Sequence, residues 1–203
     1  STDAPVTMEI ISADEIRNSG AVNIPTLLSR LAGVEVQQYG RNFHDVAIRG
    51  YNQNKTPRLL VLVNGRQVFQ DYYGFTDWDV IPVQLDEIRQ IEIVKGPNTA
   101  LFGFNAVGGV VNIITFNPLY TETNTLRGGV DFNDGVRGSG VATFRPFENT
   151  AIRMSAGGQQ AQEFEDLPFE LRGDPQNEQW AFAAEAGIPV SYTHLRAHET
   201  LDN

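Results

Sequence analysis

The chain contains no cysteine, which excludes a disulfide framework, a thiolate metal site and a cysteine nucleophile. Basic residues are also few, with 15 Lys and Arg against 25 Asp and Glu and a formal net charge of −10. Because proteins bind nucleic acid through Lys and Arg that meet phosphates, we expect no nucleic-acid partner. The sequence has no run of about 18 apolar residues, so it predicts no transmembrane helix. A transmembrane β-barrel would leave no such run either.

The usual sequence signals of an active site are also missing. No G-x-S-x-G motif occurs, and His44 is the only histidine outside the C-terminal tail; we expect it to be solvated in a polar loop. The glycine-rich residues 96–109 lack both the Gly-Lys-Ser/Thr of a P-loop and a G-x-G-x-x-G fingerprint, so turn geometry accounts for these glycines. Asp86-Glu87 begins a predicted helical turn, where carboxylates favour the positive end. We predict that the protein is not an enzyme and has no cofactor or metal site.

Residues 1–118 predict an α+β domain with a small mixed sheet. After a strand over residues 6–11, Ser12 and Glu15 have the spacing of a capping box for a short helix. Asn23 is the expected cap of a second helix, with Pro25 in its first turn.

Two pairs of short strands are expected next in the chain. Residues 34–37 and 46–49 flank a polar turn at residues 39–44. Residues 59–63 form an apolar strand, and Asn64-Gly65 predicts a tight hairpin turn to a return strand over residues 67–70.

Residues 88–116 predict two core strands joined by a capped turn. Ile91 and Ile93 alternate with more polar neighbours, and Lys95-Gly96-Pro97 ends this strand. Asn98 is placed to cap a short helix over residues 99–102. Residues 110–115 are rich in β-branched side chains and predict a strand buried on both faces around Asn112.

This stretch resembles the segment that closes the plug domain of TonB-dependent outer-membrane receptors. The family pattern is R-x-I-E-V-x-x-G-P, then A-L-Y-G, then A-x-G-G-V-I-N-I-I-T. The matching segments here are residues 89–97, 100–103 and 106–115. Residues 31–36 and Ile48-Arg49-Gly50 are similar to earlier parts of the plug, so the resemblance covers nearly all of residues 1–118.

The pattern changes after residue 118 to alternation with a period of two. Leu126, Gly128 and Val130 alternate with Arg127 and Gly129, and similar segments occur near residues 141–145, 152–156 and 180–186. One apolar and one polar face are typical of barrel strands between lipid and lumen. We predict that residues 119–189 are the first antiparallel strands of a transmembrane β-barrel, with the tight turn at residues 146–149 facing the periplasm. A plugged transporter has about 22 strands, so we expect a truncated barrel and a fragment of a longer receptor.

Residues 190–203 are predicted to be a non-native tail. VSYTHLRAHET, residues 190–200, resembles the translation of a sequencing-library adapter rather than a protein family. The alternative is a metal site, because His194 and His198 have an i, i+4 spacing, but no Glu or third ligand stands in motif position.

The resemblance implies a receptor in the outer membrane of a Gram-negative bacterium. Such receptors take up a scarce nutrient, such as a ferric siderophore, haem, cobalamin or sugar. TonB supplies the energy through an N-terminal box, and residues 1–5 contain no convincing box. One alternative is a soluble periplasmic plug-like binding or sensing module, which would not need the alternating segments. Another is a small α/β enzyme with a phosphate loop at residues 96–109.

The resemblance also implies two sets of functional residues. Apical plug loops meet the substrate, a small molecule or metal chelate, and the matching positions are Tyr39, Arg41, Asn52, Gln53, Asn54, Tyr72, Tyr73 and Trp78. Alternatively, the aromatic members of this set pack against the barrel wall. Arg49 and Lys95 occupy motif positions whose basic residues dock the plug to acidic wall residues, since a desolvated charge needs a partner. Lys95 replaces the more usual Arg, so its contact would be single-point rather than bidentate. The alternative for both is a solvated surface charge.

Overall fold

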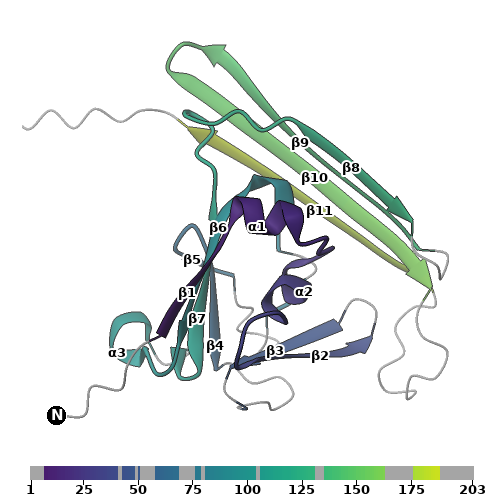
Figure 1. The fold of residues 1–203 in the computed structure, drawn as a ribbon. Coiled ribbons are helices and arrows are strands. Elements are labelled where there is room, and N and C mark those ends of the chain that lie inside the picture. Colours follow the sequence, from purple (N-terminus) through teal and green to yellow (C-terminus); the bar gives the residue numbers. More distant parts are fainter. Residues whose placement is uncertain are drawn as a thin grey trace, which may run out of the picture.

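The computed structural model describes residues 7–40, 43–48, 50, 58–68, 76–78, 81–103, 106–130, 135–162 and 176–187. Within these ranges the chain forms a mixed five-stranded sheet, a two-stranded hairpin and a four-stranded antiparallel sheet. Figure 1 shows the long strands of the four-stranded sheet as one layer that lies across the other elements. The arrangement confirms an α+β plug domain followed by antiparallel strands in an open sheet. The predicted boundaries at residues 118 and 189 stay predictions.

The five-stranded sheet is mixed because one of its strand pairs is parallel. Its order is β1-β6-β7-β4-β5, and its strands are β1 (Thr7–Ser12), β6 (Ile88–Lys95), β7 (Gly109–Thr115), β4 (Leu59–Val63) and β5 (Arg66–Gln67). β4 runs parallel to β7, and the other neighbours are antiparallel. The central β7 is buried over most of its length, as its β-branched run predicts. Asn64 and Gly65 turn the chain from β4 to β5 with φ values of 50° and 77°.

Two short helices cover one face of this sheet. α1 (Ala13–Asn18) begins with the predicted capping box, in which Ser12 Oγ accepts from Glu15 N at 3.3 Å and Glu15 Oε2 accepts from Ser12 N at 2.7 Å. α2 (Ile24–Leu28) is capped by Asn23, whose Oδ1 accepts from Thr26 N at 2.9 Å. Buried apolar side chains join both helices to the sheet in one core, among them Ile16, Leu27, Leu28, Ile91, Ile93 and Ile113.

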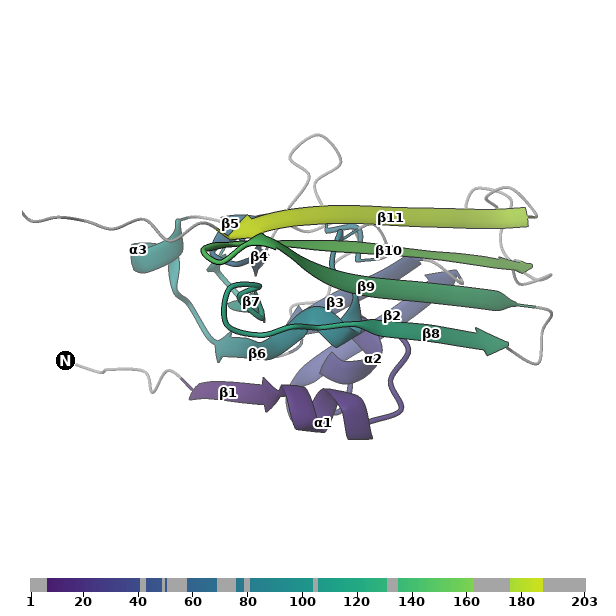
Figure 2. The same ribbon diagram turned by 90° about the horizontal axis from the view of Figure 1, so that it is seen from above.

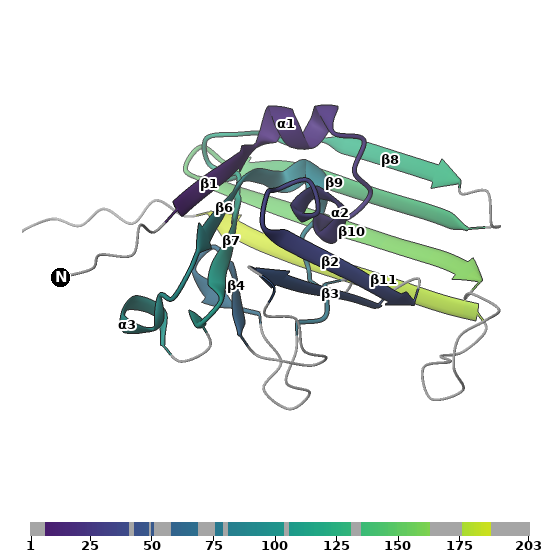
Figure 3. The same ribbon diagram turned by 60° about the horizontal axis from the view of Figure 1, so that its bottom comes forward.

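Two local predictions are wrong. The hairpin strands β2 (Val34–Gly40) and β3 (Phe43–Ile48) extend further than predicted, so His44 lies in a strand and is 9% exposed rather than solvated in a loop. Figure 3 shows this hairpin beside α2. Asn98 occupies the N-cap position of α3 (Thr99–Phe102) but makes no side-chain capping bond; its amide donates instead to the carbonyl of Gly96 at 3.0 Å.

The four-stranded sheet has one apolar and one polar side. Its strands, in chain and spatial order, are β8 (Thr125–Val130), β9 (Val136–Phe147), β10 (Thr150–Gln162) and β11 (Gln176–Gly187). Figure 2 shows them running side by side over the plug. Leu126, Val130, Phe144 and Met154 are exposed on the outer side, and Leu126 is 89% exposed. Arg127, Arg153 and Ser155 contact the plug from the inner side.

No helix in the described ranges is long and apolar enough to cross a membrane.

Candidate functional site

The candidate site is the interface between the plug and the inner side of the four-stranded sheet. On the plug side stands the 3₁₀ turn η1 (Leu85–Glu87), which leads directly into β6. Arg153 of β10 reaches this turn, and its Nε lies 3.0 Å from Glu87 Oε2. The exposed fractions of the two side chains are only 2% and 4%. A fully buried ion pair therefore joins the plug to the sheet.

Hydrogen bonds from both parts complete this ion pair. Ser155, two residues after Arg153 on the same strand face, donates its hydroxyl to Glu87 Oε1 at 2.9 Å. Arg153 also donates to the carbonyl of Phe116, at the point where the chain leaves β7. Glu87 Oε1 accepts the backbone N–H of Gln84 at 2.6 Å, which holds the carboxylate over its own turn. Such bonds compensate for the desolvation of two buried charges.

A second pair lies beside the first. Arg127 of β8 is 2.6 Å from Asp86 Oδ1, and the arginine is 44% exposed while the aspartate is 6% exposed. Asp86 and Glu87, neighbours in η1, thus bind two different strands of the sheet.

Sequence reasoning missed these plug–sheet contacts. The sequence predicts that Asp86-Glu87 begins a helical turn, and both residues do lie in the turn η1. It does not predict the arginines that pair with them. A signal was present in the alternating segments, because Arg127 and Arg153 are cations on the polar side of strands whose other side is apolar. A cation at such a position indicates an acidic partner on the element that packs against the inner side of the sheet.

Lys95 is held inside the plug. The residue is buried at the end of β6, and its ammonium lies 2.7 Å from Glu9 Oε1 of β1 and donates to the carbonyl of Ala32. The described residues of the four-stranded sheet supply no partner for it, so its predicted docking to a barrel wall stays a prediction. Arg49, its predicted companion, lies outside the described residues.

Of the predicted ligand-binding residues, the structure describes Tyr39 and Trp78. Tyr39 is half-buried near the tip of the β2–β3 hairpin, and its hydroxyl donates to Gln37. Desolvation, followed by the nearby Asp45 and Glu35, raises the pKa of the Tyr39 hydroxyl. Trp78 is 6% exposed. Arg41, Asn52, Gln53, Asn54, Tyr72 and Tyr73 lie outside the described residues, so the structure does not bring this set together.

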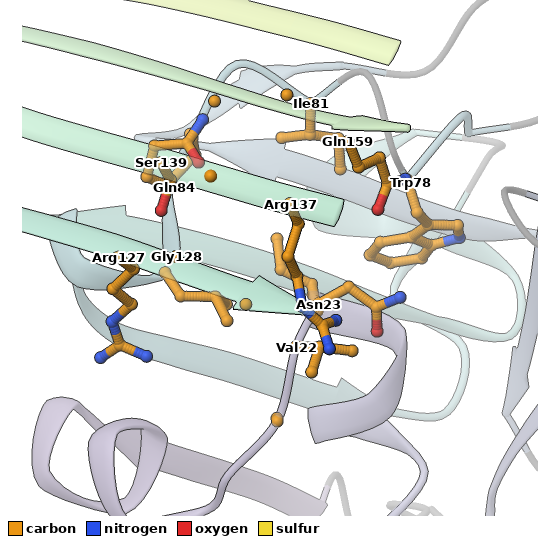
Figure 4. A pocket seen from close by; sticks show the side chains of 18 of the residues that line it. Val22, Asn23, Trp78, Ile81, Gln84, Arg127, Gly128, Arg137, Ser139 and Gln159 are labelled. Carbon is orange, nitrogen blue, oxygen red and sulfur yellow. The ribbon is translucent and has the colours of Figure 1, made fainter. Parts of the chain in front are cut away.

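Trp78 lines a cavity between the plug and the sheet. The cavity has a volume of about 380 Å³ and is bounded by residues 20–24, by residues 78, 81 and 83–85, and by strands β8, β9 and β10. Figure 4 shows Trp78 and Gln159 together at one end and Arg127 at the other. Trp78 also belongs to the hydrophobic core of the plug, and both roles proposed for it, substrate contact and packing against a barrel wall, stay predictions.

Within the described ranges, no three His, Asp or Glu side chains gather in a way that could hold a metal ion.

Comparisons with known proteins agree with this architecture. The family model described as TonB-dependent Receptor Plug Domain matches residues 1–110. The vitamin B12 transporter BtuB of Vibrio vulnificus is 34% identical over 151 residues, which cover 73% of this chain and 24% of that protein. The BtuB of Photobacterium profundum is 35% identical over 128 residues, covering 62% of this chain and 20% of that protein. The chain therefore spans about a quarter or less of the length of these curated relatives.

Solved structures show the same fold. The siderophore receptor PirA from Pseudomonas aeruginosa matches with a TM-score of 0.62 and 23% identity, covering 91% of this chain and 32% of that one. The ferric-catecholate import receptor Fiu from E. coli matches with a TM-score of 0.58 and 21% identity, covering 77% and 21%. The plug model matches more than half of the chain, and the plug fold is present with antiparallel strands packed on it. This chain belongs to the TonB-dependent receptors, which are proteins of the Gram-negative outer membrane.

Proposed function

We propose that this chain is the plug and first wall strands of an active-transport receptor for a scarce nutrient. In this proposal residues 1–118 form the plug, residues 119–189 begin the barrel, and residues 190–203 are not native. The receptor works as a transporter and not as an enzyme. TonB supplies the energy by binding a segment that precedes β1.

One observation carries this proposal: the plug is seated on the polar side of an antiparallel sheet whose other side is apolar. The buried Glu87–Arg153 pair stands on the plug side, and exposed Leu126, Phe144 and Met154 stand on the other. An apolar outer side suits hydrocarbon, where a strand must bury its polar groups inward. A soluble periplasmic module would gain nothing from this outer side.

The enzyme alternative depends on a phosphate loop at residues 96–109, and the described glycines of this segment have another use. In the glycine-rich segment, Gly109 allows close contact between strands, since a Cβ there would lie 2.5 Å from the carbonyl oxygen of Val94. A backbone hydrogen bond joins Gly96 and Gly108, in which Gly96 N donates to Gly108 O at 3.1 Å. These glycines serve strand packing rather than a ligand.

Cobalamin is the first substrate to test, because the curated relatives with 34% identity are vitamin B12 transporters. Ferric siderophores are the next, since the solved neighbours named above are siderophore receptors, although they share only the fold. The apical positions Tyr39, Arg41, Asn52–Asn54, Tyr72, Tyr73 and Trp78 remain the proposed substrate contacts, with Arg49 and Lys95 as docking residues.

The test is uptake by the complete receptor in a Gram-negative host that lacks its own B12 and siderophore receptors. We expect labelled cobalamin or a labelled ferric siderophore to accumulate, and accumulation to stop when the host's TonB is deleted. Uptake that persists without TonB would contradict the proposal. Replacing Tyr72, Tyr73 and Trp78 together should weaken substrate binding, and an unchanged affinity would remove these residues from the site.

A further inference from the structure

The cavity under the four-stranded sheet has a charge opposite to that of the chain. Among the described residues, its lining includes Arg127 and Arg137 but no Asp or Glu, although the whole chain has a formal net charge of −10. Low-dielectric walls lined by one sign of charge focus the electric field and concentrate ions of the opposite sign. At about 380 Å³ the cavity lies within the roughly 300–1,000 Å³ range of small-molecule sites.

The two arginines differ in their partners. Arg127 is neutralised by Asp86 at 2.6 Å. Arg137, half-buried on β9, has no carboxylate or carbonyl partner within the described part of the chain. Its side chain lies across Gly129 of β8, where a Cβ would stand 3.0 Å from Arg137 Nε, so glycine makes room for it. A partly desolvated cation without a counter-ion is stabilised when an anion binds.

Uncharged donors of the plug and the sheet border the same space. Asn23 uses its Oδ1 to accept from Thr26 N at 2.9 Å, which leaves its amide nitrogen to donate. Ser139 follows Arg137 by two residues and shares its strand face. Figure 4 shows Arg137 extending toward the loop of Val22 and Asn23. Trp78 supplies an apolar wall.

We propose that this cavity binds a small oxyanion, a carboxylate or phosphate group, with Arg137 as its charged ligand and Asn23 and Ser139 as further donors. The planar guanidinium fork matches two oxygens of either group. The site is separate from the proposed apical substrate contacts apart from Trp78, and it does not depend on which nutrient the receptor transports.

Isothermal titration of the purified complete receptor with citrate and with inorganic phosphate tests this site. We expect saturable binding of at least one probe that weakens as salt increases, and the tighter probe identifies the preferred group. Arg137→Gln should weaken this binding by about tenfold, which corresponds to about 1.4 kcal/mol.

Arg145→Gln is the matched control. It removes the same charge from the same strand, but Arg145 pairs with Glu122 at 2.7 Å and does not line the cavity. The affinity of the Arg145→Gln receptor for the probe should equal that of the unaltered receptor. An equal loss in Arg145→Gln and Arg137→Gln would overturn the proposal, because it would indicate a general charge effect.

Asn23→Asp keeps the proposal testable if Arg137→Gln does not fold. Asp caps a helix as well as Asn, so α2 should remain intact while a negative charge enters the cavity. We expect the melting temperature to stay unchanged and probe binding to fall by about tenfold or more. Full probe affinity in this variant, or no saturable binding to the unaltered receptor, would refute the site.

Discussion

Arg153 of β10 and Glu87 of η1 form an ion pair with a 3.0 Å separation, and both side chains are almost fully buried. Ser155 and the carbonyl of Phe116 take part in the same cluster. Because desolvating two charges offsets much of their attraction, such a pair contributes more to the position of its elements than to net stability. Here it fixes the start of β6 against the inner side of the sheet.

Arg153→Met should strongly destabilise the seated plug. The variant leaves the Glu87 carboxylate buried without its cation, a situation that costs about 3–5 kcal/mol. Urea denaturation of the purified receptor measures the change in free energy of unfolding. Arg145→Met, which removes an arginine whose ion pair is exposed, should change it by at most about 1 kcal/mol. Equal effects of the two substitutions would contradict this role for Arg153.

Combining Glu87→Leu with Arg153→Met should be less damaging than the sum of the two single changes. The double variant leaves neither charge buried alone, and contacting residues couple by about 0.5–3 kcal/mol. A double-mutant cycle on the same unfolding free energies gives this coupling. Strict additivity would mean that the two side chains act independently.

Gly109→Ala should destabilise the plug by about 1–3 kcal/mol or more, the usual range for overpacking. A Cβ at this position would lie 2.5 Å from the backbone oxygen of Val94 and 2.8 Å from Ile48 Cδ1. Gly128→Ala is the matched control, since nothing stands within 4 Å of a Cβ there. Melting temperatures compare the two, and a fall in the Gly128 variant as large as in the Gly109 variant would refute the steric argument.

Lys95→Met should loosen the N-terminal strand. Among the described strands β1 lies at the edge of its sheet next to β6, and the Lys95–Glu9 contact of 2.7 Å joins the two. We expect faster hydrogen exchange at the β1 amides, with smaller change in β7. Arg17→Gln breaks the exposed Arg17–Asp14 pair and should leave β1 exchange unaltered. If Lys95→Met also leaves hydrogen exchange at the β1 amides unaltered, the Lys95–Glu9 contact does not stabilise β1.

Asp45→Asn should stabilise the plug at neutral pH but not in acid. Desolvation is the main cause that raises the pKa of the Asp45 carboxyl, Glu35 raises it further, and the Val46 N–H lowers it. A carboxyl whose pKa is higher in the folded state lowers stability once it ionises. This penalty is absent below the unfolded-state pKa and is complete above the folded-state pKa.

Melting temperatures of the Asp45→Asn variant and the unaltered protein, measured at several pH values, check this sign. The gain should appear as the pH rises through the carboxyl's titration range. A gain of equal size in strong acid would show that ionisation of Asp45 is not its source.

The sequence by itself determined the elements and the family of this protein. The Ser12–Glu15 capping box, the Asn64-Gly65 turn and the β-branched residues of β7 depend on neighbours in the chain, so they appear in the structure where the sequence predicted them. The alternation after residue 118 likewise predicted one apolar and one polar side, because side chains of a strand alternate.

Only the tertiary structure decided what the polar side contacts. Ser155 and Glu87 are 68 positions apart, and no local pattern encodes which carboxylate meets which strand. The prediction for His44 is wrong for a similar reason, since its burial follows from the pairing of β3 with β2 and not from its polar neighbours in the chain. The cavity beside Arg137 is lined by residues of both the plug and the four-stranded sheet, so it forms only where the two pack together. Distances and burial across such an interface follow from packing, whereas strands and turns follow from local sequence.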